Sequence, residues 1–190
     1  ALLRTNAAEF AELIGPHASL VEFGSGSSTK VRILLDALEA PSAYIPIDIS
    51  CDHLIESAKG LADAYPDLMV VPVSADYTQP LELPEIPGEL VRIGFFPGST
   101  IGNFSHTEAV DFLHTAATEL GADNGLLIGV DLKKDPAILH AAYNDAAGIT
   151  AKFNLNILHH INRELGADFD LDGFVHDARW QSEKGSIEMH

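Results

Sequence analysis

Apolar runs and amphipathic segments alternate along the chain from residue 19 to residue 131. Five of the apolar runs have the length and composition of buried strands. They lie at residues 19–23 (SLVEF), 43–48 (AYIPID), 68–73 (LMVVPV), 90–96 (LVRIGFF) and 125–131 (GLLIGVD). Nearly continuous apolar strands that alternate with helical segments are typical of a parallel sheet covered by helices on both faces. The pattern therefore predicts an α/β fold.

Helical patterns fill the gaps between these runs. Segment 29–38 places four apolar residues on one helical face, namely Val31, Leu34, Leu35 and Leu38. Ser105 and Glu108 have the S-x-x-E spacing of a capping box, which predicts the start of a helix. The apolar stripe expected on that helix consists of Val110, Leu113 and Ala117. Segment 78–88 (TQPLELPEIPG) is rich in proline and indicates a surface loop.

The alternation stops after Asp131, and the rest of the chain predicts a separate α+β unit. Asp135 followed by proline can cap a helix that runs to about residue 147, and a second helix can run from about 150 to 165. Segment 173–189 indicates a hairpin with its turn near Lys184 and Gly185. We therefore expect two domains, residues 1–132 and residues 133–190.

Charge and cysteine content narrow the possible partners. The chain has 11 lysine and arginine residues against 28 aspartate and glutamate residues, which gives a formal net charge of −17 and a pI near 4.6. Such a surface repels phosphate groups, so we expect neither a nucleic-acid partner nor a membrane partner. The single cysteine fits a cytoplasmic protein, and the nine histidines lack metal-ligand spacing, so no metal site is expected. The sequence indicates no oligomeric state.

A glycine turn follows the first predicted strand. In the segment LVEFGSGSSTK, residues 20–30, an acidic residue near the strand end precedes Gly24 and the start of a helix, which lets backbone approach a nucleotide-like ligand. Asp48 ends the second predicted strand and can accept hydrogen bonds from both ribose hydroxyls of an adenosine. Asp76 follows the third and can accept from the adenine amino group. The alternative for each carboxylate is an exposed loop position.

This arrangement suits either a nicotinamide dinucleotide or S-adenosylmethionine (SAM). Two observations favour SAM. The turn lacks the third glycine of the dinucleotide pattern, and Lys30 in the first helical turn can pair with the methionine carboxylate. The alternative for Lys30 is a solvated surface lysine.

The segment FFPGSTIGNF, residues 95–104, leaves the fourth predicted strand through small and polar residues. Gly98 and Gly102 permit tight turns, and Asn103 offers one acceptor and two donors to a polar substrate. This segment would lie beside the reactive end of a cofactor bound over the first strand. The alternative for Asn103 is a helix cap.

Several segments together carry a resemblance to a known family. They are residues 21–38, 44–50, 95–104, 131–135, 141–158, 162–180 and 187–189. In them the chain resembles the histidine Nα-methyltransferases of ergothioneine biosynthesis, which are SAM-dependent class I methyltransferases. The resemblance implies a Rossmann-like SAM-binding core over residues 1–132 and part of a substrate-binding α+β unit over residues 133–190. It also implies that the chain is a fragment of a longer protein.

The resemblance implies a reaction and a set of binding residues. SAM would donate methyl groups to the α-amino group of histidine up to the trimethylated betaine, leaving S-adenosylhomocysteine. The residues implied for the cofactor are Gly24, Lys30, Asp48, Asp76 and Tyr77, and those implied for histidine are Gly98, Asn103, Tyr143 and Met189. No residue is assigned as a general base. The family's contacts to the imidazole ring are expected beyond residue 190.

Three alternatives remain at the level of the sequence. The chain can be a noncatalytic or truncated module that binds an adenosine ligand, a methyltransferase for another small amine or amino acid, or a nicotinamide oxidoreductase. Binding measurements with SAM, S-adenosylhomocysteine and NAD distinguish the oxidoreductase from the others.

Overall fold

The structure is a computed structural model in which residues 2–190 are described. These residues form two compact units, a first that ends at Asp131 and a second, Leu132–His190. Each unit is described by itself below.

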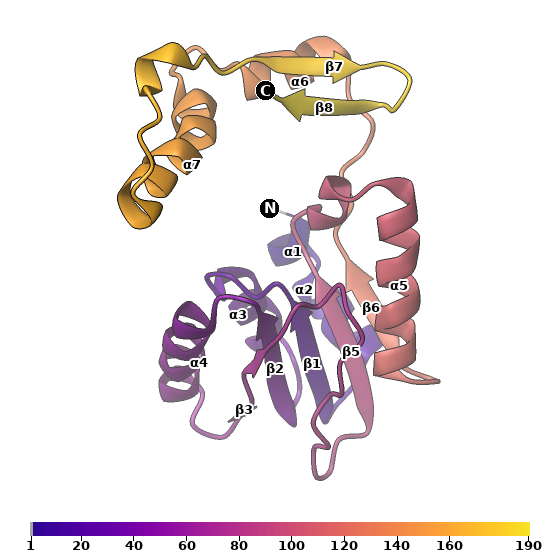
Figure 1. The fold of residues 1–190 in the computed structure, drawn as a ribbon. Coiled ribbons are helices and arrows are strands. Elements are labelled where there is room, and N and C mark those ends of the chain that lie inside the picture. The colour runs from indigo at the N-terminus through magenta and orange to yellow at the C-terminus, as the bar shows by residue number, and fades with distance from the viewer. Residues whose placement is uncertain (1) are drawn as a thin grey trace. The chain divides into compact units, whose positions relative to one another are not determined.

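The first unit is built on a parallel sheet (Figure 1). Its strands are β1 (Ala18–Phe23), β2 (Ala43–Asp48), β3 (Met69–Val70), β4 (Val73–Ser74), β5 (Val91–Phe96) and β6 (Gly125–Ile128). They are ordered β3-β2-β1-β5-β6, with β4 also paired to β2, and every pair is parallel. All six residues of β1 are buried, which is the burial expected of a central strand covered on both faces. The predicted α/β fold is confirmed.

The third predicted strand is broken in two. Met69 pairs with Ala43 and Val73 pairs with Ile47, so β3 and β4 both extend the same edge of β2. Pro72 lies between them and has no N–H to donate to a ladder, which interrupts the regular pairing. The prediction of one continuous strand over 68–73 was therefore wrong, and the last strand also ends earlier than predicted, at Ile128.

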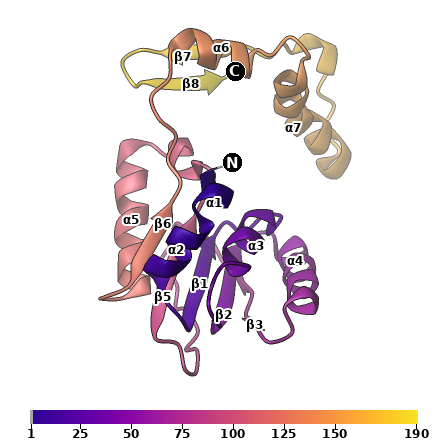
Figure 2. The same ribbon diagram turned by 180° about the vertical axis from the view of Figure 1, so that it is seen from behind.

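Helices cover both faces of the sheet (Figures 1 and 2). The helices α1 (Leu2–Thr5), α2 (Ala7–Ile14), α3 (Thr29–Leu35) and α4 (Cys51–Ala64) contribute to a core around Leu20, Tyr44 and Phe95. On the other face α5 (His106–Leu120) and the loop 78–88 contribute to a core around Phe23, Phe96 and Phe112. The predicted apolar face of 29–38 is confirmed because all four of its residues are buried. Helices α1 and α2 were not predicted.

The start of α5 was predicted correctly, but its buried face was not. The hydroxyl of Ser105 accepts from the N–H of Glu108, whose carboxylate accepts from the N–H of Ser105, so the capping box is confirmed. The core contains Phe112, Ala116 and Leu120, whereas Val110 is 52% and Leu113 38% exposed. The helix has apolar residues on two faces. The ring of Phe112 selects one of them by packing against four aromatic rings, those of Phe23, Tyr77, Phe96 and Phe104.

The second unit contains α6 (Pro136–Tyr143), α7 (Ile149–Leu165), the 3₁₀ turn η2 (Leu171–Gly173) and an antiparallel hairpin of β7 (Ala178–Gln181) and β8 (Ser186–Met189). The hairpin was predicted, and Gly185 in its turn has a φ of +66°. Helix α6 is shorter than predicted because it ends at Tyr143, and Asp145 lies in the loop that leads to α7. The Asp145 carboxylate accepts from the N–H groups of Ile149 and Thr150, and these bonds lower its pKa to about 2.

Over the part of the chain that the structure describes, no helix has the length and apolar character needed to cross a membrane.

Candidate functional site

The order of the strands brings three loops to one edge of the sheet. From β1 the chain moves outward through β2 to β3 and β4, and then returns to the other side of β1 to form β5. Open α/β sheets bind their ligands at the carboxyl ends of the strands where the order reverses in this way. Six of the predicted site residues lie at this edge or in the loops that leave it. They are Gly24 after β1, Asp48 at the end of β2, Asp76 and Tyr77 after β4, and Gly98 and Asn103 after β5.

The glycine turn after β1 is tied to the end of β2. The N–H groups of Gly24 and Ser25 both donate to the carbonyl of Ile47, at 2.9 and 3.1 Å. Gly24 has a φ of +73°, and a Cβ at this position would lie 3.2 Å from the Cε1 atom of Tyr77. A larger residue would therefore strain the backbone and press on the tyrosine ring.

Asp48 joins the first loop to the second. Its Oδ1 atom accepts from the N–H of Ser50 at 2.9 Å, and its Oδ2 atom accepts from the N–H of Gly26 at 3.4 Å. These bonds fix the direction of the carboxylate, and each oxygen keeps capacity for a further donor. The side chain is partly exposed, so a ligand hydroxyl can reach it.

Asp76 and Tyr77 follow β4 in the next loop. The Asp76 Oδ1 atom accepts from the hydroxyl and the N–H of Thr78, which keeps the pKa of this exposed carboxyl below its usual value. The ring of Tyr77 packs edge-on against Phe23 and Phe96. Burial raises the pKa of the Tyr77 phenol, and the charges of Asp48 and Asp76 raise it further. The two carboxylates and the phenol thus lie close enough to interact electrostatically.

Lys30 and Glu22 place opposite charges near the glycine turn. The Nζ atom of Lys30 lies 2.5 Å from the position that a Cβ on Gly98 would occupy, so a side chain at residue 98 would require the ammonium to move. Glu22 is 3% exposed, and the hydroxyl of Tyr44 donates to its carboxylate. Burial raises the pKa of Glu22 to about 7, although the Tyr44 hydrogen bond and the Lys30 charge both act to lower it.

The loop after β5 is held to the end of β6. Gly98 and Ser99 have φ values of +82° and +60°, and residues 100–103 form the 3₁₀ turn η1. The N–H of Ser99 donates to the carbonyl of Gly129, and the Ser99 hydroxyl accepts from the N–H of Asp131, both at 3.0 Å. These bonds hold the start of the loop to the segment that follows β6.

Asn103 presents a free amide from this loop. Its side chain is exposed and makes no hydrogen bond to any residue between 2 and 190. The alternative that Asn103 caps the following helix was wrong, because Ser105 is the N-cap of α5.

Tyr143 and Met189 lie in the second unit. Tyr143 ends α6, and its carbonyl accepts from Nε2 of His176 at 2.7 Å. The Nδ1 atom of the same ring faces the amide of Asn154 at 3.1 Å. Met189 ends β8 opposite Ala178 and is 41% exposed.

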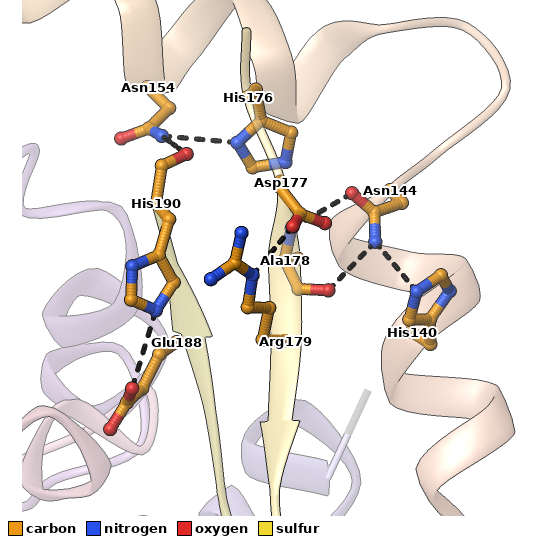
Figure 3. Close-up of polar contacts among 9 residues, drawn as sticks. All are labelled: His140, Asn144, Asn154, His176, Asp177, Ala178, Arg179, Glu188 and His190. Carbon is orange, nitrogen blue, oxygen red and sulfur yellow. Dashed lines mark hydrogen bonds and ion pairs between the residues drawn. The ribbon is translucent and has the colours of Figure 1, made fainter.

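The hairpin is fastened to α6 by one side chain (Figure 3). The amide of Asn144 donates to the carbonyl of Ala178 at 3.0 Å and accepts from its N–H at 3.1 Å. The structure therefore places Tyr143 and Met189 in one packed unit, and Gly98 and Asn103 in the other.

Three polar side chains of the first unit were absent from the predicted site. Ser25 is 6% exposed, and its hydroxyl has no hydrogen-bond partner within the described part of the chain. Glu22 and Tyr44 form the buried pair described above. The sequence does contain a signal for Glu22, since it is the one acidic residue in the apolar run SLVEF.

The site has the donors and acceptors that SAM requires. A carboxylate at the end of β2 suits ribose hydroxyls, a cation at Gly98 suits the methionine carboxylate, and the glycine turn leaves room where a Cβ would meet Tyr77. Among residues 2–190 the buried Ser25 hydroxyl finds no hydrogen-bond partner. Among residues 2–190 no three histidine, cysteine, aspartate or glutamate side chains gather as metal ligands would.

Comparison with known proteins gives a consistent result. The family described as "Histidine-specific methyltransferase, SAM-dependent" matches residues 1–190. The histidine N-alpha-methyltransferase of Mycolicibacterium smegmatis is 43% identical over 191 residues, and that of Mycobacterium tuberculosis is 41% identical over 191 residues. Each match covers 99% of this chain, and the chain spans 59% of each relative's length.

A solved structure supports the fold. The S-adenosylmethionine-dependent methyltransferase SibL superposes with a TM-score of 0.51 at 16% identity, over 67% of this chain and 35% of SibL. At this identity the similarity concerns the arrangement of helices and strands.

Proposed function

Because the chain belongs to the family of histidine-specific, SAM-dependent methyltransferases, we propose that the protein transfers methyl groups from SAM to the α-amino group of histidine. The product of repeated transfer is the trimethylated betaine used in ergothioneine biosynthesis. The single observation that supports this proposal beyond the family match is a pair of charges at the carboxyl edge of the sheet. The Lys30 ammonium lies against the loop of Gly98, and the Asp48 carboxylate is held by the N–H groups of Gly26 and Ser50.

The cofactor is assigned to the loops after β1, β2 and β4. Asp48 accepts from the ribose hydroxyls, Asp76 accepts from the adenine amino group, and Lys30 pairs with the methionine carboxylate. Gly24 lets the backbone approach the ligand, and the half-buried ring of Tyr77 supplies an apolar surface next to it. When bound, SAM supplies an electrophilic methyl group on its sulfonium.

Four residues are assigned to histidine in this proposal. Gly98 and Asn103 in the first unit, and Tyr143 in the second, hold its amino and carboxylate groups, and Met189 contacts its side chain. The support for Asn103 is its exposed amide, which makes no hydrogen bond within the described part of the chain and can donate to a carboxylate and accept from an amine at once.

The protein's part in the reaction is alignment. The α-amine attacks only when neutral, and each transfer releases one proton from nitrogen. Holding the amine in line with the methyl group lowers the barrier by several kcal/mol because both partners are already oriented. No side chain is assigned as the proton acceptor, so the proton leaves to water in this scheme.

Mass spectrometry of the reaction mixture tests the proposal. The protein at its natural length, with SAM and histidine, is expected to yield histidine carrying one, two and three added methyl groups, together with S-adenosylhomocysteine. Other amino acids serve as matched controls for specificity. If a different amine is methylated and histidine is not, the protein is a methyltransferase for another small amine or amino acid. If the cofactor binds and no methyl group is transferred, the result favours a noncatalytic module.

A further inference from the structure

Two of the residues assigned to histidine lie at the ends of their elements. Tyr143 is the last residue of α6, and Met189 is the last residue of β8. Both side chains are exposed, so little packing fixes them, and their positions depend on how the backbone at each end is held. The carbonyl of Tyr143 is among the last four of its helix and therefore has no partner within the helix. Ends of this kind fray unless another group binds them.

His176 binds the free carbonyl at the end of α6. Its Nε2 atom lies 2.7 Å from the carbonyl oxygen of Tyr143, and because a carbonyl oxygen only accepts, Nε2 carries the proton of this bond. The Nδ1 atom of the same ring lies 3.1 Å from the amide nitrogen of Asn154. An amide nitrogen only donates, so Nδ1 accepts. Hydrogen bonds on both sides therefore fix the direction of the His176 ring.

Asn154 joins this ring to the end of β8. Its amide nitrogen donates to the carbonyl of His190, the residue after Met189, at 3.2 Å (Figure 3). The same carbonyl accepts from the N–H of Asp177 at 3.0 Å, and the N–H of His190 donates to the carbonyl of Asp177 at 2.8 Å. One side chain of α7 thus binds both the ring that holds Tyr143 and the residue that follows Met189.

We infer that Asn154 and His176 are positioning residues, which set Tyr143 and Met189 in the places where they contact histidine. Neither is proposed to touch histidine, because both act through the backbone at the ends of α6 and β8. This inference rests on the proposed function, in which Tyr143 and Met189 bind the substrate. The alternative is that the two side chains only fasten the second unit together.

The same helix contains a matched control for that alternative. Asn162 lies further along α7, and its amide donates to the carbonyl of Phe169 and accepts from the N–H of Phe169, both at 2.9 Å. Like Asn154, it makes two hydrogen bonds that connect α7 to another segment of the second unit. Within residues 2–190 its side chain bonds to no residue assigned to histidine. A purely structural role predicts the same result for both asparagines.

Steady-state kinetics of the protein at its natural length test the inference. Asn154→Leu keeps the size of the side chain and removes both bonds, so the KM for histidine should rise about three- to tenfold, as expected when one hydrogen bond to the substrate loses its geometry. The KM for SAM should not change, because the residues assigned to SAM lie in the first unit. Asn162→Leu should lower the melting temperature by a similar amount and change neither KM.

Two variants of His176 test the bond to Tyr143. His176→Leu removes the donor and should raise the KM for histidine as Asn154→Leu does. The longer amide of His176→Gln can place an N–H close to the position of Nε2, so this variant should recover most of the loss. Once Tyr143→Phe has removed the phenol, adding His176→Leu should cost much less than it does in the unaltered protein. Losses that simply add would overturn the inference.

The outcomes separate this inference from the proposed function. If the unaltered protein methylates histidine and a folded Asn154→Leu has the same KM for histidine, the positioning role is overturned and the proposed function stands. An equal rise in Asn162→Leu also overturns it, because a general loosening of α7 would act in both. If the unaltered protein neither binds nor methylates histidine, both fall. If Asn154→Leu does not fold, the two His176 variants decide, and an equal KM for histidine in both overturns the inference.

Discussion

Asp48 is the residue on which the proposed ribose contact depends. Replacing it with alanine removes two charge-assisted hydrogen bonds, so Asp48→Ala should weaken binding of S-adenosylhomocysteine by about 2–3 kcal/mol. Asp52→Ala, an exposed carboxylate in the first turn of α4, is the matched control and should bind normally. Calorimetry on both folded variants measures the difference, and equal affinities would remove Asp48 from the site.

Glu22 also predicts a dependence of stability on pH. Its folded pKa of about 7 is above the ordinary value of 4.5, so the folded state holds a proton that the unfolded state has released. Its contribution to stability is therefore present below pH 4.5 and is lost as the pH rises towards 7. The amide that Glu22→Gln introduces does not titrate, so this variant should gain up to about 3 kcal/mol relative to the unaltered protein between acidic and neutral pH.

Denaturant unfolding of the two proteins at several pH values measures that gain. If the free energies of unfolding of the two proteins differ by the same amount at every pH, Glu22 titrates as an ordinary carboxyl. Neither the depth of Glu22 nor its bond to Tyr44 could be predicted from the sequence, because the two residues are far apart in the chain and meet only through the pairing of β1 with β2.

The loop between β5 and α5 contains a proposed binding residue, Asn103, and a structural residue, Ser105. Ser105→Ala removes the helix cap and should lower the free energy of unfolding by about 1 kcal/mol while leaving histidine binding intact. Asn103→Ala should do the reverse, with stability and cofactor affinity kept and histidine binding lost. Thermal melts and histidine titrations give the stability and the affinity of each variant. If Asn103→Ala is destabilised but binds histidine normally, the assignment of Asn103 is wrong.

The buried face of α5 gives a second prediction for an element. Phe112 is 2% exposed among aromatic rings, so Phe112→Ala should lower the free energy of unfolding by about 3–5 kcal/mol. Leu113 is 38% exposed, so Leu113→Ala should lower the free energy of unfolding much less. Chemical denaturation compares the two, and a larger loss at Leu113 would mean that the helix packs by its other face.

The strands and helices that could be predicted from the sequence are those with one strong local signal. The apolar runs, the Ser105 capping box and the glycine of the hairpin turn each appear within a few residues. Where two signals compete, as on the two apolar faces of α5 or around Pro72 in the third strand, long-range packing decides. That packing involves Phe23, Phe96 and Phe104, which come from other elements.

For the molecule as a whole, the sequence predicts the type of site better than its supporting contacts. The strand order brings the loops of Gly24, Asp48 and Gly98 to one edge, as expected for residues that end parallel strands. The contact between Lys30 and Gly98 depends on the exact course of two loops and has no sequence signal of its own. Tyr143 and Met189 belong to a second compact unit, and their role in binding histidine stays a prediction.

The central claim is that the carboxyl edge of the sheet holds SAM, and ligand selectivity tests it most directly. Calorimetry of the chain with S-adenosylhomocysteine and with NAD should show saturable binding of S-adenosylhomocysteine and none of NAD, because the glycine turn lacks the third glycine that seats a pyrophosphate. Saturable binding of NAD, with no heat from S-adenosylhomocysteine, would contradict it.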